Sequence, residues 1–319
     1  MSQESRIRGA LRPPILLGTA IWAVFAVASF SPKVHLGIIE VLFLLGPWVV
    51  VPLGADLIKG APNSKSSGVL DSVLFAAASL TTVSFFLDNR TAAAWFASSW
   101  LLVSAGFAGD GLRRFATSGM KSFTQFCFAA GEGYLLIAAA WLVASRAGLR
   151  LLAFREPIVL LTAVHFHFAG FASAVLAGLA YERFRESRWN ALLRVALLAV
   201  VCGPGILGLA FLLGPKVKLV AALLIALGQL GVASGMVRVG ISAKNSAGRW
   251  LLFVAGASVA AGMILAAVWA IGEYPLQPFV NIRQMAEFHG VLNAVGFAIC
   301  GLLGWTMMKA ERAALSSIQ

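Results

Sequence analysis

The sequence predicts an all-α membrane protein, a bundle of about ten transmembrane helices with both termini in the cytoplasm. Three observations predict this class: 60% of the 319 residues are hydrophobic, only 12% are charged, and the mean hydropathy is +0.87. The charged share is about half that of an ordinary soluble domain. With about 20 apolar residues per span and about ten per connector, this length leaves no room for a soluble domain. We therefore expect one integral membrane domain over residues 1–319.

Each predicted helix is an apolar run between short polar or basic connectors, and alternating segments typical of strands are absent. The first run follows basic residues and contains, near its end, Ala26-Val27-Ala28, which has the form of a signal cleavage site. Its length favours retention as a span. The runs lie at 13–31, 36–58, 69–87, 91–109, 123–145, 156–181, 191–213, 217–239, 249–271 and 283–307.

Basic residues predict the orientation of these helices. About 17 of the 25 Lys and Arg residues lie in the N-terminal tail and in every second connector, and the remainder lie in the other connectors. Because cytoplasmic connectors carry the excess of positive charge, both termini are expected in the cytoplasm. The net charge of +12 is then explained by topology, and we expect the lipid bilayer as a partner and no nucleic acid.

Polar residues inside the spans are the candidate functional residues, because an ionisable group at membrane depth costs free energy unless it is paired or faces a cavity. The second, sixth and tenth helices enter from the non-cytoplasmic side, so their polar residues lie in the outer half of the membrane. Glu132 enters from the cytoplasmic side and lies near mid-depth. We expect one outer-half pocket formed by Glu40, Glu132, His165, His167, His289 and Asn293.

Helical phase gives these side chains directions. His289, Asn293 and Gly296 share one face of an ideal helix, and the glycine permits a close approach, so this face is expected to point into the bundle. His165 and His167 lie about 200° apart around their helix. They cannot both bind one metal ion on an ideal helix, so we expect no metal site that uses both.

Three segments resemble the signatures of the bacterial YndJ-like membrane protein family. They are residues 40–54 (EVLFLLGPWVVVPLG), residues 165–171 (HFHFAGF) and residues 289–297 (HGVLNAVGF). The resemblance covers most of the chain and implies a multi-pass membrane protein of the bacterial inner membrane. It implies that Glu40, His165, His167, His289 and Asn293 belong to one site, and it assigns none of them a reaction. Glu132 is a candidate on burial alone.

Three functions fit these residues. The first, which we favour, is a cofactor-independent isomerase, cyclase or epoxide-opening enzyme, in which a Glu and the His residues exchange protons with a lipophilic substrate and Asn293 orients it. The second is a proton-coupled transporter of a small or lipid-like molecule. The third is a haem or copper protein with one His ligand per helix. The structural alternative is that each polar side chain only joins neighbouring helices through a hydrogen bond.

Overall fold

The computed structural model describes residues 11–59, 65–152, 154–243, 246–275, 277 and 279–316. These residues form helices and no strand. Among them, eight helices are long and apolar enough to cross a membrane, and two shorter apolar helices span Pro13–Ala28 and Gly68–Ser84. The prediction of an all-α, multi-pass integral membrane protein is thereby confirmed, whereas the count of ten spans stays a prediction.

The chain folds as two compact units, which we describe separately. Unit 1 holds the described residues of Met1–Ser118 and Phe128–Ala172, and unit 2 holds those of Gly119–Cys127 and Ser173–Gln319. Helix α7 (Phe123–Ala147) therefore begins in unit 2 and continues in unit 1. Besides α7, unit 1 contains α2 (Pro13–Ala28), α3 (Ile38–Leu45), η1 (Gly46–Val50), α4 (Val51–Lys59), α5 (Lys65–Ser84), α6 (Arg90–Ser118), α8 (Ile158–His165) and η3 (Phe166–Ala172).

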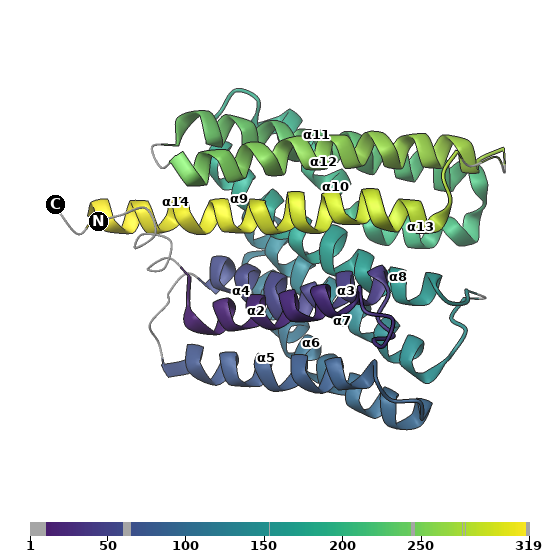
Figure 1. Ribbon diagram of the computed structural model, residues 1–319. Coiled ribbons are helices and arrows are strands. Elements are labelled where there is room, and N and C mark those ends of the chain that lie inside the picture. The colour runs from purple at the N-terminus through teal and green to yellow at the C-terminus, as the bar shows by residue number, and fades with distance from the viewer. Residues whose placement is uncertain are drawn as a thin grey trace. The chain divides into compact units, whose positions relative to one another are not determined.

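The continuous segment Ile38–Lys59, which consists of α3, η1 and α4, forms the core of unit 1. In its apolar 18-residue stretch, 83% of the residues are buried. Glycines allow its neighbours to approach closely. A Cβ atom built on Gly54 would lie 2.6 Å from the Phe171 ring, and one built on Gly18 would collide with the Trp48 backbone. Helix α2 (dark purple in Figure 1) lies beside this segment.

Arg12 fixes the start of α2 to two other helices of unit 1. Its guanidinium donates to Asp56 of α4 at 2.6 Å and to Asp71 of α5 at 2.5 Å. Burial lowers the pKa of Arg12, but the hydrogen bonds and charges of the two carboxylates outweigh that effect and raise it overall. These ion pairs tie the ends of three helices together at the end of the unit that the sequence predicts to be cytoplasmic.

Unit 2 is built from long apolar helices that pack side by side, with α11 and α12 adjacent and α14 beside α12 (Figure 1). Gln229 of α11 donates to Ser173 Oγ of α9 at 2.9 Å, which joins those two helices. The elements of unit 2 besides the start of α7 are η2 (Gly119–Lys121), α9 (Ser173–Phe184), α10 (Asn190–Leu213), α11 (Pro215–Ser242), α12 (Ser246–Glu273), α13 (Ile282–Met285), η4 (Ala286–Gly290), η5 (Leu292–Ile299) and α14 (Cys300–Ser316).

Four segments, η1, η3, η4 and η5, are π-helical where the sequence predicts regular α-helix. Local chemistry accounts for three of them. In η3, the His167 ring donates to the carbonyl of Ala163, and in η5 the Asn293 amide donates to the carbonyl of His289. Each side chain thereby occupies a carbonyl that an α-helical N–H would use, which favours a wider turn. In η1, Pro47 lacks the N–H that an α-helix requires.

Candidate functional site

His167 of η3 is completely buried in unit 1. The indole N–H of Trp100 donates to its Nε2 at 2.9 Å, so Nε2 is an acceptor and carries no proton. Its Nδ1 lies 2.8 Å from the carbonyl oxygen of Ala163, which can only accept, so Nδ1 carries the proton. Both ring nitrogens of His167 are therefore engaged, and its tautomer follows from its partners.

Aromatic and small residues close the remaining surface of His167. Phe43 packs edge-on against the ring with 5.1 Å between centroids, and both Phe43 and Trp100 are fully buried. A Cβ atom on Gly46 would lie 2.9 Å from Cδ2 of the imidazole, so the glycine makes room for the ring. We call this cluster the His167 clasp (Phe43, Gly46, Trp100 and His167). It joins three parts of unit 1, namely the segment Ile38–Lys59, α6 and η3.

His165 lies two residues earlier on the same segment and is exposed. The two histidines therefore face different surroundings, as the helical phase predicts, although the helix becomes π-helical between them. In the part of the chain that the structure describes, no group of three or more His, Cys, Asp or Glu side chains is placed to hold a metal ion.

His289 of η4 is half-buried in unit 2 and has a different set of neighbours. Its Nδ1 lies 2.9 Å from the carbonyl oxygen of Gly262 on α12. Asn293 donates from Nδ2 to the carbonyl of His289 at 2.8 Å, and the same nitrogen lies 3.3 Å from the histidine Nδ1. The Gly262 carbonyl thus favours the neutral tautomer with the proton on Nδ1, which makes Nε2 the basic atom of the ring.

Close packing against α12 fixes this arrangement, which we call the His289 site (Ser258, Gly262, His289, Asn293 and Gly296). A Cβ atom on Gly262 would collide with the Asn293 amide, and one on Gly296 would collide with the Ser258 hydroxyl. His289, Asn293 and Gly296 therefore all contact α12 and share one face, as the sequence predicts. Small residues at these positions let the two helices come close enough for the histidine to reach a backbone carbonyl.

Glu132 of α7 is completely buried and forms an ion pair with Arg114 of α6, with 3.1 Å between Oε2 and Nε. Asp110 lies one turn before Arg114 on α6 and pairs with Lys59 of α4 at 3.6 Å. At Gly111 a side chain would lie 3.0 Å from Glu132 Cβ, so the two helices are close here. Glu132 is thus part of a charged cluster that continues to the helix ends.

Glu40 and Glu287 have local partners. Glu40 is half-buried and accepts from the backbone N–H of Gly37 at 2.9 Å, which caps the start of α3. Glu287 accepts from Arg283 at 2.8 Å, one turn earlier. Of the six candidate residues, Glu40, Glu132, His165 and His167 belong to unit 1, and His289 and Asn293 belong to unit 2. The single pocket for all six residues therefore stays a prediction.

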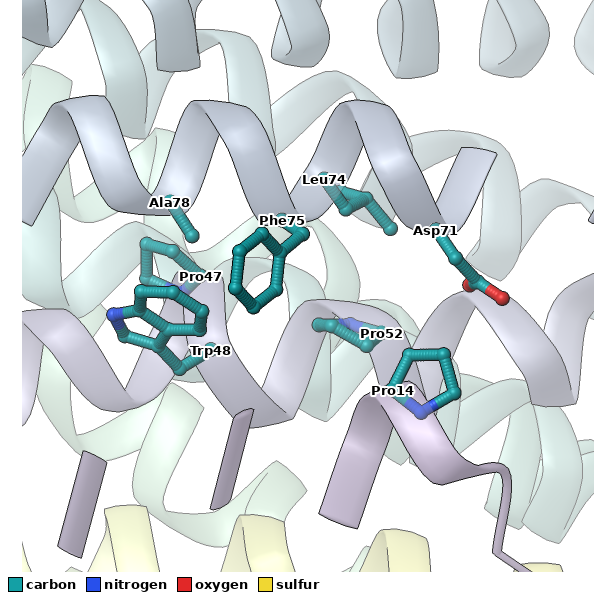
Figure 2. Close-up of a pocket in the computed structure, with 8 residues that line it drawn as sticks. All are labelled: Pro14, Pro47, Trp48, Pro52, Asp71, Leu74, Phe75 and Ala78. Atoms are coloured by element: carbon teal, nitrogen blue, oxygen red, sulfur yellow. The ribbon is translucent and has the colours of Figure 1, made fainter. Parts of the chain in front are cut away.

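Figure 2 shows a cavity in unit 1 in which the rings of Trp48 and Phe75 lie beside three prolines and Asp71 marks one end. Its volume of about 20 Å³ admits roughly one water molecule. Asp71 is held by Arg12, and none of the six candidate residues lines the cavity. The cavity is lined by Pro14, Pro47, Trp48, Pro52, Asp71, Leu74, Phe75 and Ala78.

Sequence reasoning missed the partners that define each candidate residue. Trp100 lies in an apolar run, where the sequence does not distinguish it from a lipid-facing aromatic, and Gly262 contributes only a backbone carbonyl. The sequence predicts Arg114 in the connector between the runs 91–109 and 123–145, whereas it lies inside α6, which extends to Ser118. Its pairing with Glu132 joins two different helices, so no spacing within one helix indicates it.

Comparisons with known proteins agree with the membrane class. A family model described as YndJ-like protein matches residues 41–297, which include every candidate residue except Glu40. A Bacillus subtilis (strain 168) protein, called uncharacterized membrane protein YndJ, is 26% identical over 185 residues, or 56% of this chain. The chain covers about a third of that relative, 32% of its length. No solved structure matches.

Proposed function

The chain belongs to the YndJ-like protein family, and we propose that it is a ten-span membrane enzyme with cytoplasmic termini that isomerises a lipophilic substrate by proton transfer. Eight long apolar helices and two shorter ones match the ten apolar runs, which supports the span count. The alternation of basic connectors supports the cytoplasmic orientation of both termini. The single observation that carries the proposed chemistry is the geometry of His289.

His289 combines three properties that a general base needs. Its Nδ1 is held by the Gly262 carbonyl, its ring is half-buried, and Asn293 braces the backbone carbonyl of the same residue. The ring is thus oriented in advance, and its proton-accepting nitrogen is defined by the hydrogen bond at the other nitrogen. An apolar, low-dielectric setting strengthens its interaction with charge that develops on a substrate.

A single base favours isomerisation over the other reactions considered. His289 Nε2 takes a proton from one carbon of the substrate, and the resulting imidazolium returns a proton to another carbon, so the enzyme ends unchanged. No separate acid is needed. Cyclisation and epoxide opening would need a second proton donor besides this base.

Lipid mass spectrometry tests this proposal. Membranes of a host that expresses the wild-type chain are compared with membranes containing His289→Gln, with His35→Gln as the control because His35 is exposed. We expect one lipophilic species to change its retention time at constant mass with wild type and His35→Gln, and to remain unconverted with His289→Gln. An identical lipid profile for wild type and His289→Gln would contradict the proposal.

A proton-coupled transporter is the second candidate, and the buried Glu132–Arg114 pair favours it. A fully buried carboxylate is costly unless its charge is compensated, and here the compensating charges extend through Asp110 and Lys59 to the helix ends. Glu132 in such a cluster can take up a proton. The charged residues between it and the helix ends offer a route by which the proton could reach it from one end of the unit.

Proteoliposomes separate this candidate from the enzyme. Transport predicts uptake of a lipid-like solute that depends on a pH gradient and is lost in Glu132→Gln but kept in Asp88→Asn, since Asp88 is exposed. The enzyme predicts equal lipid conversion with or without a gradient. Absence of gradient-dependent uptake in wild type rejects the transporter.

A further inference from the structure

A second polar cluster, distinct from the candidate site, lies in unit 2 where three candidate spans have their ends. The spans Phe123–Ala147 and Asn190–Leu213 begin here, and Ile158–Phe184 ends here. The sequence predicts this end to be cytoplasmic. Basic residues outnumber acidic ones in this cluster. Its basic residues are Lys121, Arg183, Arg185, Arg188 and Arg194, and its acidic residues are Glu182 and Glu186.

The two carboxylates are already engaged by one arginine. Arg185 pairs with Glu182 at 3.3 Å and with Glu186 at 3.6 Å. Glu182 also accepts from the Thr124 hydroxyl at 2.8 Å. Within the described residues, Arg183, Arg188 and Arg194 form no ion pair, so their charges are available to an anion.

Two of these arginines are held in place by aromatic rings. The Arg194 guanidinium is half-buried, lies 5.2 Å from the centre of the Phe123 ring, and donates to the carbonyl of Met120 at 3.4 Å. Arg188 lies 5.1 Å from the Trp189 ring centre. Stacking orients a guanidinium and leaves N–H donors at its edge, which suits the oxygens of a phosphate group.

The surface beside these arginines suits an acyl chain. Trp189 is 48% exposed, and Leu192 and Val195, which follow it on α10, are both 65% exposed. A tryptophan at the end of a span is typical of the membrane interface, and exposed aliphatic residues on the span face lipid tails. A ligand here therefore meets cations at one end and an apolar surface at the other.

We propose that this cluster is a binding site for an anionic glycerophospholipid of the cytoplasmic leaflet. The arginines would bind the phosphodiester of its headgroup, and α10 would contact an acyl chain. Anionic headgroups gain binding free energy from each basic residue near the membrane surface, whereas zwitterionic ones do not. The proposal is independent of the chemistry at His289.

Native mass spectrometry of the full chain in detergent tests it with dioctanoyl phosphatidylglycerol as the probe. We expect Arg188→Gln and Arg194→Gln each to weaken binding about fivefold, and the double variant about 25-fold. Arg238→Gln removes an exposed arginine elsewhere in unit 2 and is expected to bind as wild type. Dioctanoyl phosphatidylcholine is expected to bind at least about fivefold more weakly than the probe.

Three results would overturn the proposal: wild-type affinity in the double variant, equal binding of phosphatidylcholine, or displacement of the probe by an equal concentration of inorganic phosphate. The last result would assign the cluster to free phosphate. Arg188 is exposed, so Arg188→Gln keeps the test valid even where Arg194→Gln fails to fold.

Discussion

His167 and His289 make the same kind of hydrogen bond but have different surroundings. Each directs Nδ1 to a backbone carbonyl, and each lies in a π-helical segment of a long apolar helix. They differ in burial and in the environment of the rest of the ring. His167 is fully buried and receives the indole N–H of Trp100, whereas His289 is half-buried and is braced by Asn293.

This comparison teaches that a histidine inside a span is not a functional signal by itself. The partner of the second ring nitrogen and the exposure of the ring decide whether the side chain holds helices together or meets a ligand. On this basis we propose that His167 holds helices of unit 1 together, and that His289 is the better candidate for proton transfer.

The largest expected effect is the loss of stability when the His167 clasp is emptied. His167→Ala removes a fully buried ring and leaves the Trp100 N–H without its acceptor, so it should destabilise the protein by about 3 kcal/mol. His289→Ala should cost about 1 kcal/mol, because its ring is only half-buried. Thermal unfolding in detergent measures both, and equal losses would break the comparison.

The next effect isolates the Trp100 hydrogen bond. Trp100→Phe leaves Nε2 of His167 buried without a donor, which should cost about 2 kcal/mol. In the double variant with His167→Phe, neither polar partner remains, so part of that loss should be recovered. A double-mutant cycle on the unfolding free energies checks this. Strictly additive costs would show that the hydrogen bond does not couple the two residues.

A smaller loss of stability, with a larger loss of function, is expected at the His289 site. Gly262→Ala places a methyl group against the Asn293 amide, so α12 and η5 must separate at a cost of about 1.5 kcal/mol. Because the separation weakens the contact that orients His289, lipid conversion should fall more than stability does. Gly208→Ala is the control, since a Cβ atom there meets no atom within 4 Å. Full conversion by Gly262→Ala would argue against an oriented base.

The smallest effect is expected at His35, which is exposed near the start of the second helix. His35→Ala should change stability by less than about 0.5 kcal/mol and leave lipid conversion intact. The same unfolding and lipid assays measure it. A large loss there would mean that burial does not separate the histidines by role.

Composition and periodicity predicted the class of the molecule and some of its contacts. The membrane class follows from the apolar runs, the opposed directions of His165 and His167 from helical phase, and the contact of Asn293 with α12 from its spacing to His289. The π-helical turns could not be predicted, because they depend on which carbonyl a side chain finds. The hydrogen bond from Trp100 to His167 could not be predicted either, because it joins residues 67 positions apart in the sequence.

Nitrogen-15 NMR of the chain labelled only at its four histidines tests the central claim most directly. We predict the Nδ1–H tautomer for both His167 and His289, with signals assigned by His→Gln variants. Removing co-purified lipophilic molecules should shift the Nε2 signal of His289 and leave that of His167 unchanged. The opposite tautomer at His289, or a lipid-dependent shift at His167 alone, would contradict the account.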